Sequence, residues 1–218
     1  MKTITRRAAT FVTAGALGLG GLAVAAPALA GNGPFGPGPA GTATVSQPGR
    51  GPGMGAGYGD GTCLQLKVTT AQGTLTESQK VTLASMAQEE KLAHDLYAAF
   101  AARYDAVVFD HIATAETRHL DAVRTLLQRY GIADPTANQQ AGKFTDPAVQ
   151  ATYDRLLAKG GTSLAEALAA GQQVERDDIA ALRDAQAGLT APDVKQVYAN
   201  LLAASERHLT AFTRWSTR

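Results

Sequence analysis

Six residues with carboxylate or imidazole side chains interrupt otherwise apolar stretches of the sequence at helical spacing. In each stretch, steps of three and four residues select apolar or small side chains at both ends and these polar ones in the middle. Because carboxylates and imidazoles together suit iron and manganese, all six are candidate metal ligands. They are Glu90, Glu116, His119, Glu175, Asp178 and His208.

The stretch IATAETRHLDAVRTLL, residues 112–127, shows the pattern most clearly. Its apolar stripe includes Ile112 and Val123, but two positions of the stripe are filled by Glu116 and His119. An uncompensated buried carboxylate costs several kcal/mol, so a helix that directs one at a core needs a partner for it. The pattern therefore predicts that other polar groups or ions meet this pair inside the protein.

Charge balance favours metal ions as that partner. No lysine or arginine falls on the inward positions, and we expect Lys91, Arg118, Arg176 and Arg207 on the flanks. Two divalent cations would balance the four carboxylates, and two neutral imidazoles would complete the ligand set. We expect iron or manganese in preference to zinc, which the ligand types do not exclude. The alternative is a polar core layer held by hydrogen bonds and water.

Three further polar residues lie beside the candidate ligands in this pattern. His94 follows Glu90 by four residues, so it either joins the ligands, supports one from behind, or lies on the flank. Ser205 precedes His208 by three residues and is predicted to lie beside the ligands. Glu89 is one position off the inward face, and we expect it to be solvated.

Four long helices must position these residues. The first begins at the capping box of Thr76 and Gln79 and extends to about residue 103, and the second covers about 106–131. The third begins at Ser163 and ends near residue 188. The fourth begins with Thr190 as the cap and ends near the C-terminus.

The connections between these helices predict how they are arranged. Two connections are short, and the one between the second and third helices is long and contains a shorter helix at roughly 147–158. This order of a short, a long and a short connection predicts an all-α fold. The expected fold is an antiparallel four-helix bundle of two hairpins joined by a crossover. The middles of the four helices meet at one level in such a bundle, so the six candidate ligands would converge there.

The N-terminal third of the chain predicts export. Residues 1–30 have a basic start, a small-residue apolar run and an Ala-x-Ala pattern at Ala28 and Ala30, which is typical of a signal peptide. The pair Arg6 and Arg7 suggests the twin-arginine route, and an uncleaved anchor is the alternative. Residues 31–74 are rich in Gly and Pro and predict a flexible tether before a bundle at 75–216.

Composition excludes several classes of protein and of site. A formal net charge of +1 gives no footprint for nucleic acid, and the single cysteine, Cys63, excludes a disulfide framework. No apolar run after residue 30 is long enough to span a membrane. We expect a secreted or extracytoplasmic protein whose partners are metal ions and dioxygen or peroxide, and a homodimer is left open.

The strings MAQEEKLAHDLY, ETRHLDAV, VERDDIAAL and ASERHLTAF resemble the ferritin-like superfamily. More closely, they resemble an uncharacterised, often exported ferritin-like family that is catalogued as a domain of unknown function. The resemblance covers about residues 75–215 and implies the ferritin-like four-helix fold. It implies a function only weakly, because a fold hosts many functions.

The resemblance also implies a ligand set. Di-iron carboxylate members take one glutamate from each of two helices and a Glu-x-x-His pair from each of the other two. Glu90 and Glu175 match the single glutamates, Glu116 and His119 match one pair, and His208 matches the histidine of the other. Ser205 stands where the second paired glutamate is expected, and Asp178 could supply the missing carboxylate.

Three functions are consistent with these residues. The first is a di-metal oxidoreductase that oxidises ferrous iron or consumes peroxide. The second is a non-catalytic metal-binding or sensing protein, and the third is a metal-free helical interaction module.

Tyr97 and Tyr198 lie on the inward faces, where we expect plain core residues, with an electron-relay role as the alternative.

Overall fold

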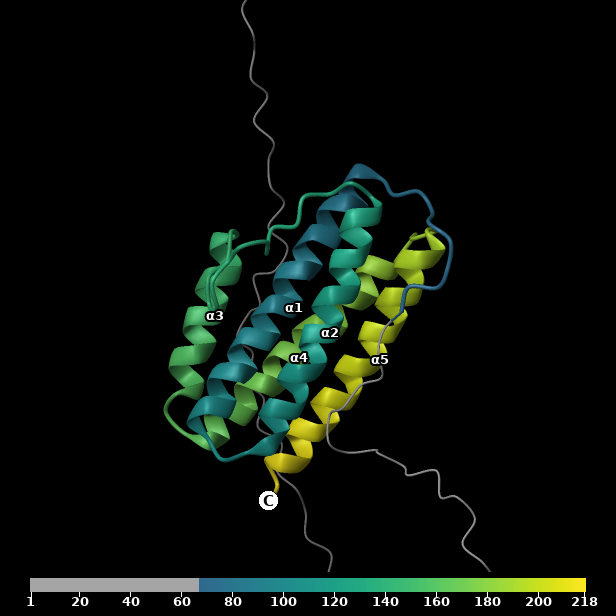
Figure 1. Ribbon diagram of the computed structural model, residues 1–218. Helices are drawn as coiled ribbons and strands as arrows, with labels where there is room; N and C mark the ends of the chain where they lie inside the picture. Colours follow the sequence, from purple (N-terminus) through teal and green to yellow (C-terminus); the bar gives the residue numbers. More distant parts are fainter. Residues whose placement is uncertain (1–66) are drawn as a thin grey trace, which may run out of the picture. The chain divides into compact units, whose positions relative to one another are not determined.

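The structure is a computed structural model, and it describes residues 67–218. The predicted signal peptide, most of the predicted tether and Cys63 lie outside the described residues. The described part contains five α-helices and no strand, which confirms the predicted all-α class (Figure 1). None of these described helices is long and apolar enough to cross a membrane. The helices are α1 (Glu77–Arg103), α2 (Val107–Arg129), α3 (Pro147–Gly160), α4 (Leu164–Gln186) and α5 (Pro192–Trp215).

Helices α1, α2, α4 and α5 form a bundle in which neighbouring helices are antiparallel (Figure 1). Tyr104, at the end of α1, donates a hydrogen bond of 2.7 Å to the carbonyl of Gly160, just before α4 begins. Tyr130, at the end of α2, donates one of 2.7 Å to Asp193 in the first turn of α5. Helix α3 lies outside the bundle beside α1 and returns the chain from one end to the other.

Local sequence signals set where the helices begin. The predicted capping box is present, because Thr76 accepts from the backbone of Gln79 and the Gln79 side chain accepts from the backbone of Thr76. The Ser163 side chain caps α4. The predicted cap of α5 is wrong by one residue: Ala191 is the cap, and Pro192, whose fixed φ suits the first helical position, begins the helix.

The outer face of α1 is covered by the crossover between α2 and α3. Lys91, predicted to be on an open flank, is buried there against the carboxylate of Asp95. Its ammonium group also donates to the carbonyl of Gln140 at 2.9 Å and stands 4.7 Å from the ring centroid of Phe144. Asp95 accepts from the backbone of Gly142 at 2.8 Å. These contacts fasten the crossover to α1.

The last part of the predicted tether, residues 67–74, lies against the bundle. Arg129 donates hydrogen bonds of 3.1 Å to the carbonyls of Val68 and Thr70. The side-chain oxygen of Gln196 accepts from the backbone of Thr70 at 3.1 Å. Polar side chains at the ends of α2 and α5 therefore hold this segment, which composition alone assigned to the flexible region.

Buried apolar side chains form two main clusters, one toward each end of the bundle. One cluster includes Tyr97, Phe100 and Phe212, and the other includes Leu83 and Leu126. Between them lies a layer of buried polar residues to which all four bundle helices contribute: Glu90, Glu116, His119, Glu175, Ser205 and His208. The interrupted apolar stripes of the sequence thus correspond to an interrupted core.

Candidate metal centre

The polar layer brings together the candidate ligands from four helices. Its carboxylates and imidazoles are Glu90 on α1, Glu116 and His119 on α2, Glu175 and Asp178 on α4, and His208 on α5. Apart from Asp178, which is half-buried, each of these residues has at most 3% of its surface exposed. Groups that carry charge are rarely buried this deeply unless they are paired or bound to an ion.

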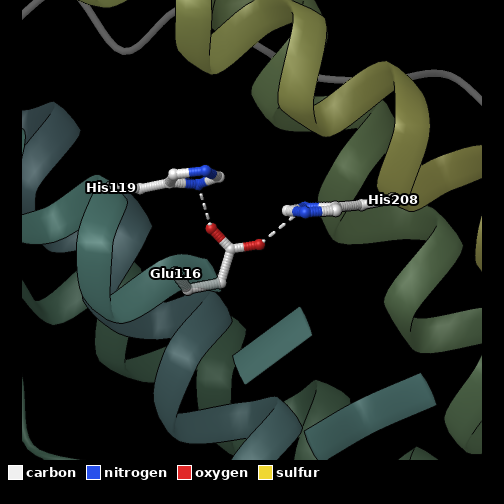
Figure 2. A group of neighbouring side chains, drawn as sticks. All are labelled: Glu116, His119 and His208. Carbon is white, nitrogen blue, oxygen red and sulfur yellow. Dashed lines mark hydrogen bonds and ion pairs between the residues drawn. The ribbon is translucent and has the colours of Figure 1, made fainter. Parts of the chain in front are cut away.

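Glu116 lies at the middle of the layer, between two imidazoles (Figure 2). Its Oε2 is 2.5 Å from Nδ1 of His119, and its Oε1 is 2.9 Å from Nδ1 of His208. The two imidazole rings stack with centroids 5.4 Å apart and an interplanar angle of 22°. In the described part of the chain, these three residues alone form a group of three or more potential ligands whose donor atoms lie within 4.8 Å of one another.

Each imidazole also faces a second carboxylate. Nδ1 of His119 is 3.5 Å from Oε2 of Glu90, and Nδ1 of His208 is 3.6 Å from Oε1 of Glu175. The layer therefore has two similar halves, each with one imidazole and one outer carboxylate. Glu116 is common to both halves.

Asp178 and Ser205 complete the layer on the α4–α5 side. The Ser205 hydroxyl donates a hydrogen bond of 2.5 Å to Oδ2 of Asp178. The other oxygen, Oδ1 of Asp178, is buried and accepts no hydrogen bond from the described residues, and the same is true of Oε1 of Glu90. Leaving a buried acceptor unpaired is costly, so these two oxygens fit the role of ligands to a cation.

Electrostatics separate Glu116 from the other carboxylates. Burial alone would raise the pKa of Glu116, but the neighbouring imidazoles of His119 and His208 outweigh burial and hold its pKa well below the usual range. Glu116 is therefore ionised at neutral pH. An ionised carboxylate shared by two imidazoles is the form that a bridging metal ligand needs.

The pKa values of the other carboxylates shift upward, in the opposite direction to that of Glu116. Burial raises the pKa of Glu90 to about 7, although His119 opposes this shift, and burial also raises the pKa of Glu175. Burial and the charges of Glu90 and Glu175 raise the pKa of Asp178 well above its ordinary value. A cation among these carboxylates would favour their ionised forms, because it would offset both effects.

Two tyrosines border the layer at the positions that the sequence predicted. The hydroxyl of Tyr97 donates a hydrogen bond of 2.7 Å to Oε1 of Glu175, and its ring centroid lies 5.0 Å from that of Phe212. Tyr198 is buried in the other apolar cluster. Both are core residues, and Tyr97 also contacts a candidate ligand directly.

The structure places His94 on the flank rather than among the ligands. Its Nδ1 is 2.9 Å from Oδ1 of Asp95, so it belongs to the contacts that hold the crossover. The expectation that Glu89 is solvated is wrong. Glu89 is half-buried, and burial together with the charge of Asp177 raises its pKa to about 7. The only sequence signal for Glu89 was its position next to Glu90.

A buried group of carboxylate and imidazole donors inside an all-helical bundle defines a helical protein with a site that could hold a metal ion. The chain belongs to the family described as "Uncharacterized protein domain (DUF2202)", whose model matches residues 79–216. This match confirms the resemblance to a domain of unknown function.

One relative is similar to this chain in both sequence and fold. Uncharacterized protein MJ0754 of Methanocaldococcus jannaschii is 38% identical over 140 residues, which cover 64% of this chain and 76% of the relative. The crystal structure of hypothetical protein MJ0754 from Methanococcus jannaschii is similar with a TM-score of 0.67 and 36% identity. That similarity covers 68% of this chain and 85% of the solved one.

Proposed function

We propose that this protein is an exported, ferritin-like metal protein that binds two divalent ions, iron or manganese, in the layer between its apolar clusters. The observation that carries the proposal is the position of Glu116 between two buried imidazoles. One of its oxygens faces His119 on α2, and the other faces His208 on α5. The unpaired buried oxygens of Glu90 and Asp178 supply further ligands of the kind that these metals prefer.

The two halves of the layer suggest how two ions would be shared among the ligands. His119 with Glu90 would hold one ion, and His208 with Glu175 would hold the other. Glu116 would serve both ions, since it contacts both imidazoles. Asp178, held by Ser205, would supply the carboxylate that the second glutamate–histidine pair lacks. This division matches the di-iron carboxylate pattern of ferritin-like proteins, with one substitution.

Oxidation of ferrous iron by peroxide is the reaction that we propose for this centre. Two ferrous ions each lose one electron, and one hydrogen peroxide takes up the two electrons and two protons to give two waters. The proposed signal peptide at residues 1–30 would place this reaction outside the cytoplasm.

Metal titration tests the proposal directly. We expect the purified protein to bind close to two equivalents of Mn²⁺ or, without oxygen, of Fe²⁺, as measured by elemental analysis after removal of free metal. Glu116→Gln should lose most of this binding, because it removes the shared charge and keeps the side-chain volume. Glu77→Gln, at an exposed position on α1, is the matched control and should bind as the wild type does. Absence of bound metal in the wild type would refute the proposal.

A non-catalytic metal-binding or sensing role is the second candidate, and Ser205 favours it because it removes one ligand from the pattern of the redox-active members. Peroxide added to the Fe²⁺-loaded protein separates the two roles. A fast rise in ultraviolet absorbance that Glu116→Gln abolishes indicates oxidation. Iron that stays bound and ferrous indicates holding or sensing. A protein that binds no metal, and whose stability a chelator does not change, would instead be a metal-free interaction module.

A further inference from the structure

The segment that precedes α1 ties the two hairpins of the bundle together at one end. Helices α1 and α2 form one hairpin, and α4 and α5 form the other. Residues 67–74, which we call the strap, lead directly into the first hairpin. They lie, however, along the beginning of α5 in the second hairpin (Figure 1). The strap is therefore a contact between hairpins that the helices themselves do not make.

A single side chain of α5 holds the backbone of the strap. The oxygen Oε1 of Gln196 accepts hydrogen bonds of 3.1 Å from the backbone N–H groups of Thr69 and Thr70. Its Nε2 donates to the carbonyl of Lys67 at 3.1 Å and to the hydroxyl of Thr69 at 2.9 Å. Gln196 is only half-buried, so water can replace these hydrogen bonds. The strap can therefore detach while the helices stay folded.

The other end of the strap closes the junction between α2 and α5. The backbone N–H of Gly73 donates to the hydroxyl of Tyr130 at 3.0 Å and to Oδ1 of Asp193 at 3.2 Å. Asp193 is fully buried, and its Oδ2 faces Arg129 at 3.6 Å. A Cβ atom at position 73 would lie 2.5 Å from Cα of Ala191, so the strap needs glycine to approach α5 this closely.

The proposed ligands are divided between the same two hairpins. The first hairpin carries Glu90, Glu116 and His119, and the second carries Glu175, Asp178 and His208. An ion that is bound by both sets loses half of its ligands when the hairpins move apart. His208 lies on α5, the helix whose beginning the strap fixes, and a helix moves largely as one rigid element.

We propose that the strap controls the release of metal from the centre. While it is bound, it holds the beginning of α5 against the end of α2. When it detaches, the two hairpins separate more readily and the ions leave faster. This inference rests on the proposed function, because it assigns a means of regulation to that same centre. Polar segments with few buried apolar contacts open at the lowest free-energy cost in a folded protein, which suits the strap to this role.

Two variants detach the strap from opposite sides and leave every proposed ligand in place. Gln196→Ala removes the hydrogen bonds that α5 makes to the strap, and Gly73→Ala forces a side chain against the backbone of Ala191. In the metal-free protein, we expect the strap amides to exchange with solvent roughly ten-fold faster in both variants, as measured by NMR. In the Mn²⁺-loaded protein, transfer of Mn²⁺ to an excess of fluorescent chelator should also be roughly ten-fold faster.

A matched control separates the strap from a general loss of hydrogen bonds. Gln173→Ala removes hydrogen bonds to Asp177 within α4 and should keep both wild-type rates. Helix content measured by circular dichroism should be the same in all variants, which excludes unfolding as the cause.

The outcomes distinguish this inference from the proposed function. Faster amide exchange with wild-type Mn²⁺ release in both variants would overturn the role of the strap and leave the proposed function standing. Wild-type amide exchange in both variants would also overturn it, because the strap would then not be the element that detaches. If the wild type binds no Mn²⁺, the proposed function fails and control of release fails with it.

Discussion

The hydroxyl of Tyr97 on α1 donates a hydrogen bond of 2.7 Å to Oε1 of Glu175 on α4. The ring of Tyr97 belongs to an apolar cluster, while its hydroxyl reaches the polar layer. This hydrogen bond favours the ionised form of Glu175 and so opposes the effect of burial on its pKa. Tyr97 thereby connects the packing of the core to the chemistry of the centre.

Tyr97→Phe should weaken metal binding as well as stability. Loss of a buried hydrogen bond to a charged group costs about 1–3 kcal/mol of unfolding free energy, and loss of a group that supports a ligand costs roughly 10- to 100-fold in metal affinity. Tyr104→Phe is the control, since it also removes a hydrogen bond of 2.7 Å, but one to the carbonyl of Gly160. Equal metal affinities in the two variants would show that Tyr97 is only a packing residue.

Removal of metal should lower thermal stability, because the proposed ligands come from both helical hairpins and assemble only in the folded protein. A free ion at 100 times its dissociation constant stabilises the folded state by about 2.7 kcal/mol. Each kcal/mol corresponds to roughly 2–4 °C in Tm for a protein of this size. Calorimetry with Mn²⁺, and then with excess chelator, measures the shift, which Glu116→Gln should abolish. A Tm that is insensitive to both treatments would contradict the two-hairpin centre.

The contacts of Asp95 with the crossover should make stability depend on acid pH. Burial alone would raise the pKa of Asp95, but hydrogen bonds from His94, Lys91 and the backbone of Gly142 outweigh it and lower the pKa. The stabilisation is therefore fully present above the unfolded pKa of about 3.9 and is lost as pH falls through the lower folded value.

Urea unfolding between about pH 2 and pH 6 measures this dependence. Asp95→Asn should lower the unfolding free energy by about 1–3 kcal/mol near pH 6 and flatten the acid end of the profile. Asp121→Asn, at an exposed position on α2, serves as the control. A profile of Asp95→Asn parallel to that of the wild type would mean that the Asp95 pKa is not lowered by folding.

Gly160→Ala should destabilise the protein by steric overlap with Phe100. A Cβ atom at position 160 would lie 2.2 Å from Cζ of Phe100, whose ring is fully buried. Overpacking of this kind costs about 1–3 kcal/mol. Thermal or urea unfolding of Gly160→Ala, Phe100→Leu and the double variant gives the coupling between the two sites. The smaller leucine should relieve part of the Gly160→Ala penalty, and strictly additive effects would refute the overlap.

Periodicity was sufficient to predict the residues of the central layer. Glu116, His119 and His208 each interrupt an apolar stripe of a helix. Because such a stripe faces the core, a polar residue within it is expected to be buried. The same reasoning fixed the level at which they meet, because antiparallel hairpins bring the middles of the helices together. The contact of Glu116 with His119 follows from their spacing of three residues on one helix, whereas its contact with His208 depends on tertiary structure and had no sequence signal of its own.

Residues buried by loops or by the edges of helix contacts were not predictable in this way. Lys91 was predicted to lie on a flank, because no local pattern shows that the crossover covers that side of α1. Glu89 lies one residue from the inward stripe, and its burial depends on how closely α4 packs beside α1. Helix ends followed local signals within a residue or two, as the shift of the α5 cap from Thr190 to Ala191 illustrates.

The position of Glu116 between His119 and His208 bears on how the two proposed metal ions would bind one after the other. In the proposed two-ion centre, Glu116 would contact both ions, so the binding of one ion would change its charge distribution and the two binding events would be thermodynamically linked. Titration curves should then depart from those of two independent sites. The sign of that cooperativity would show whether the first ion to arrive prepares the bundle for the second or competes with it for the shared oxygen atoms.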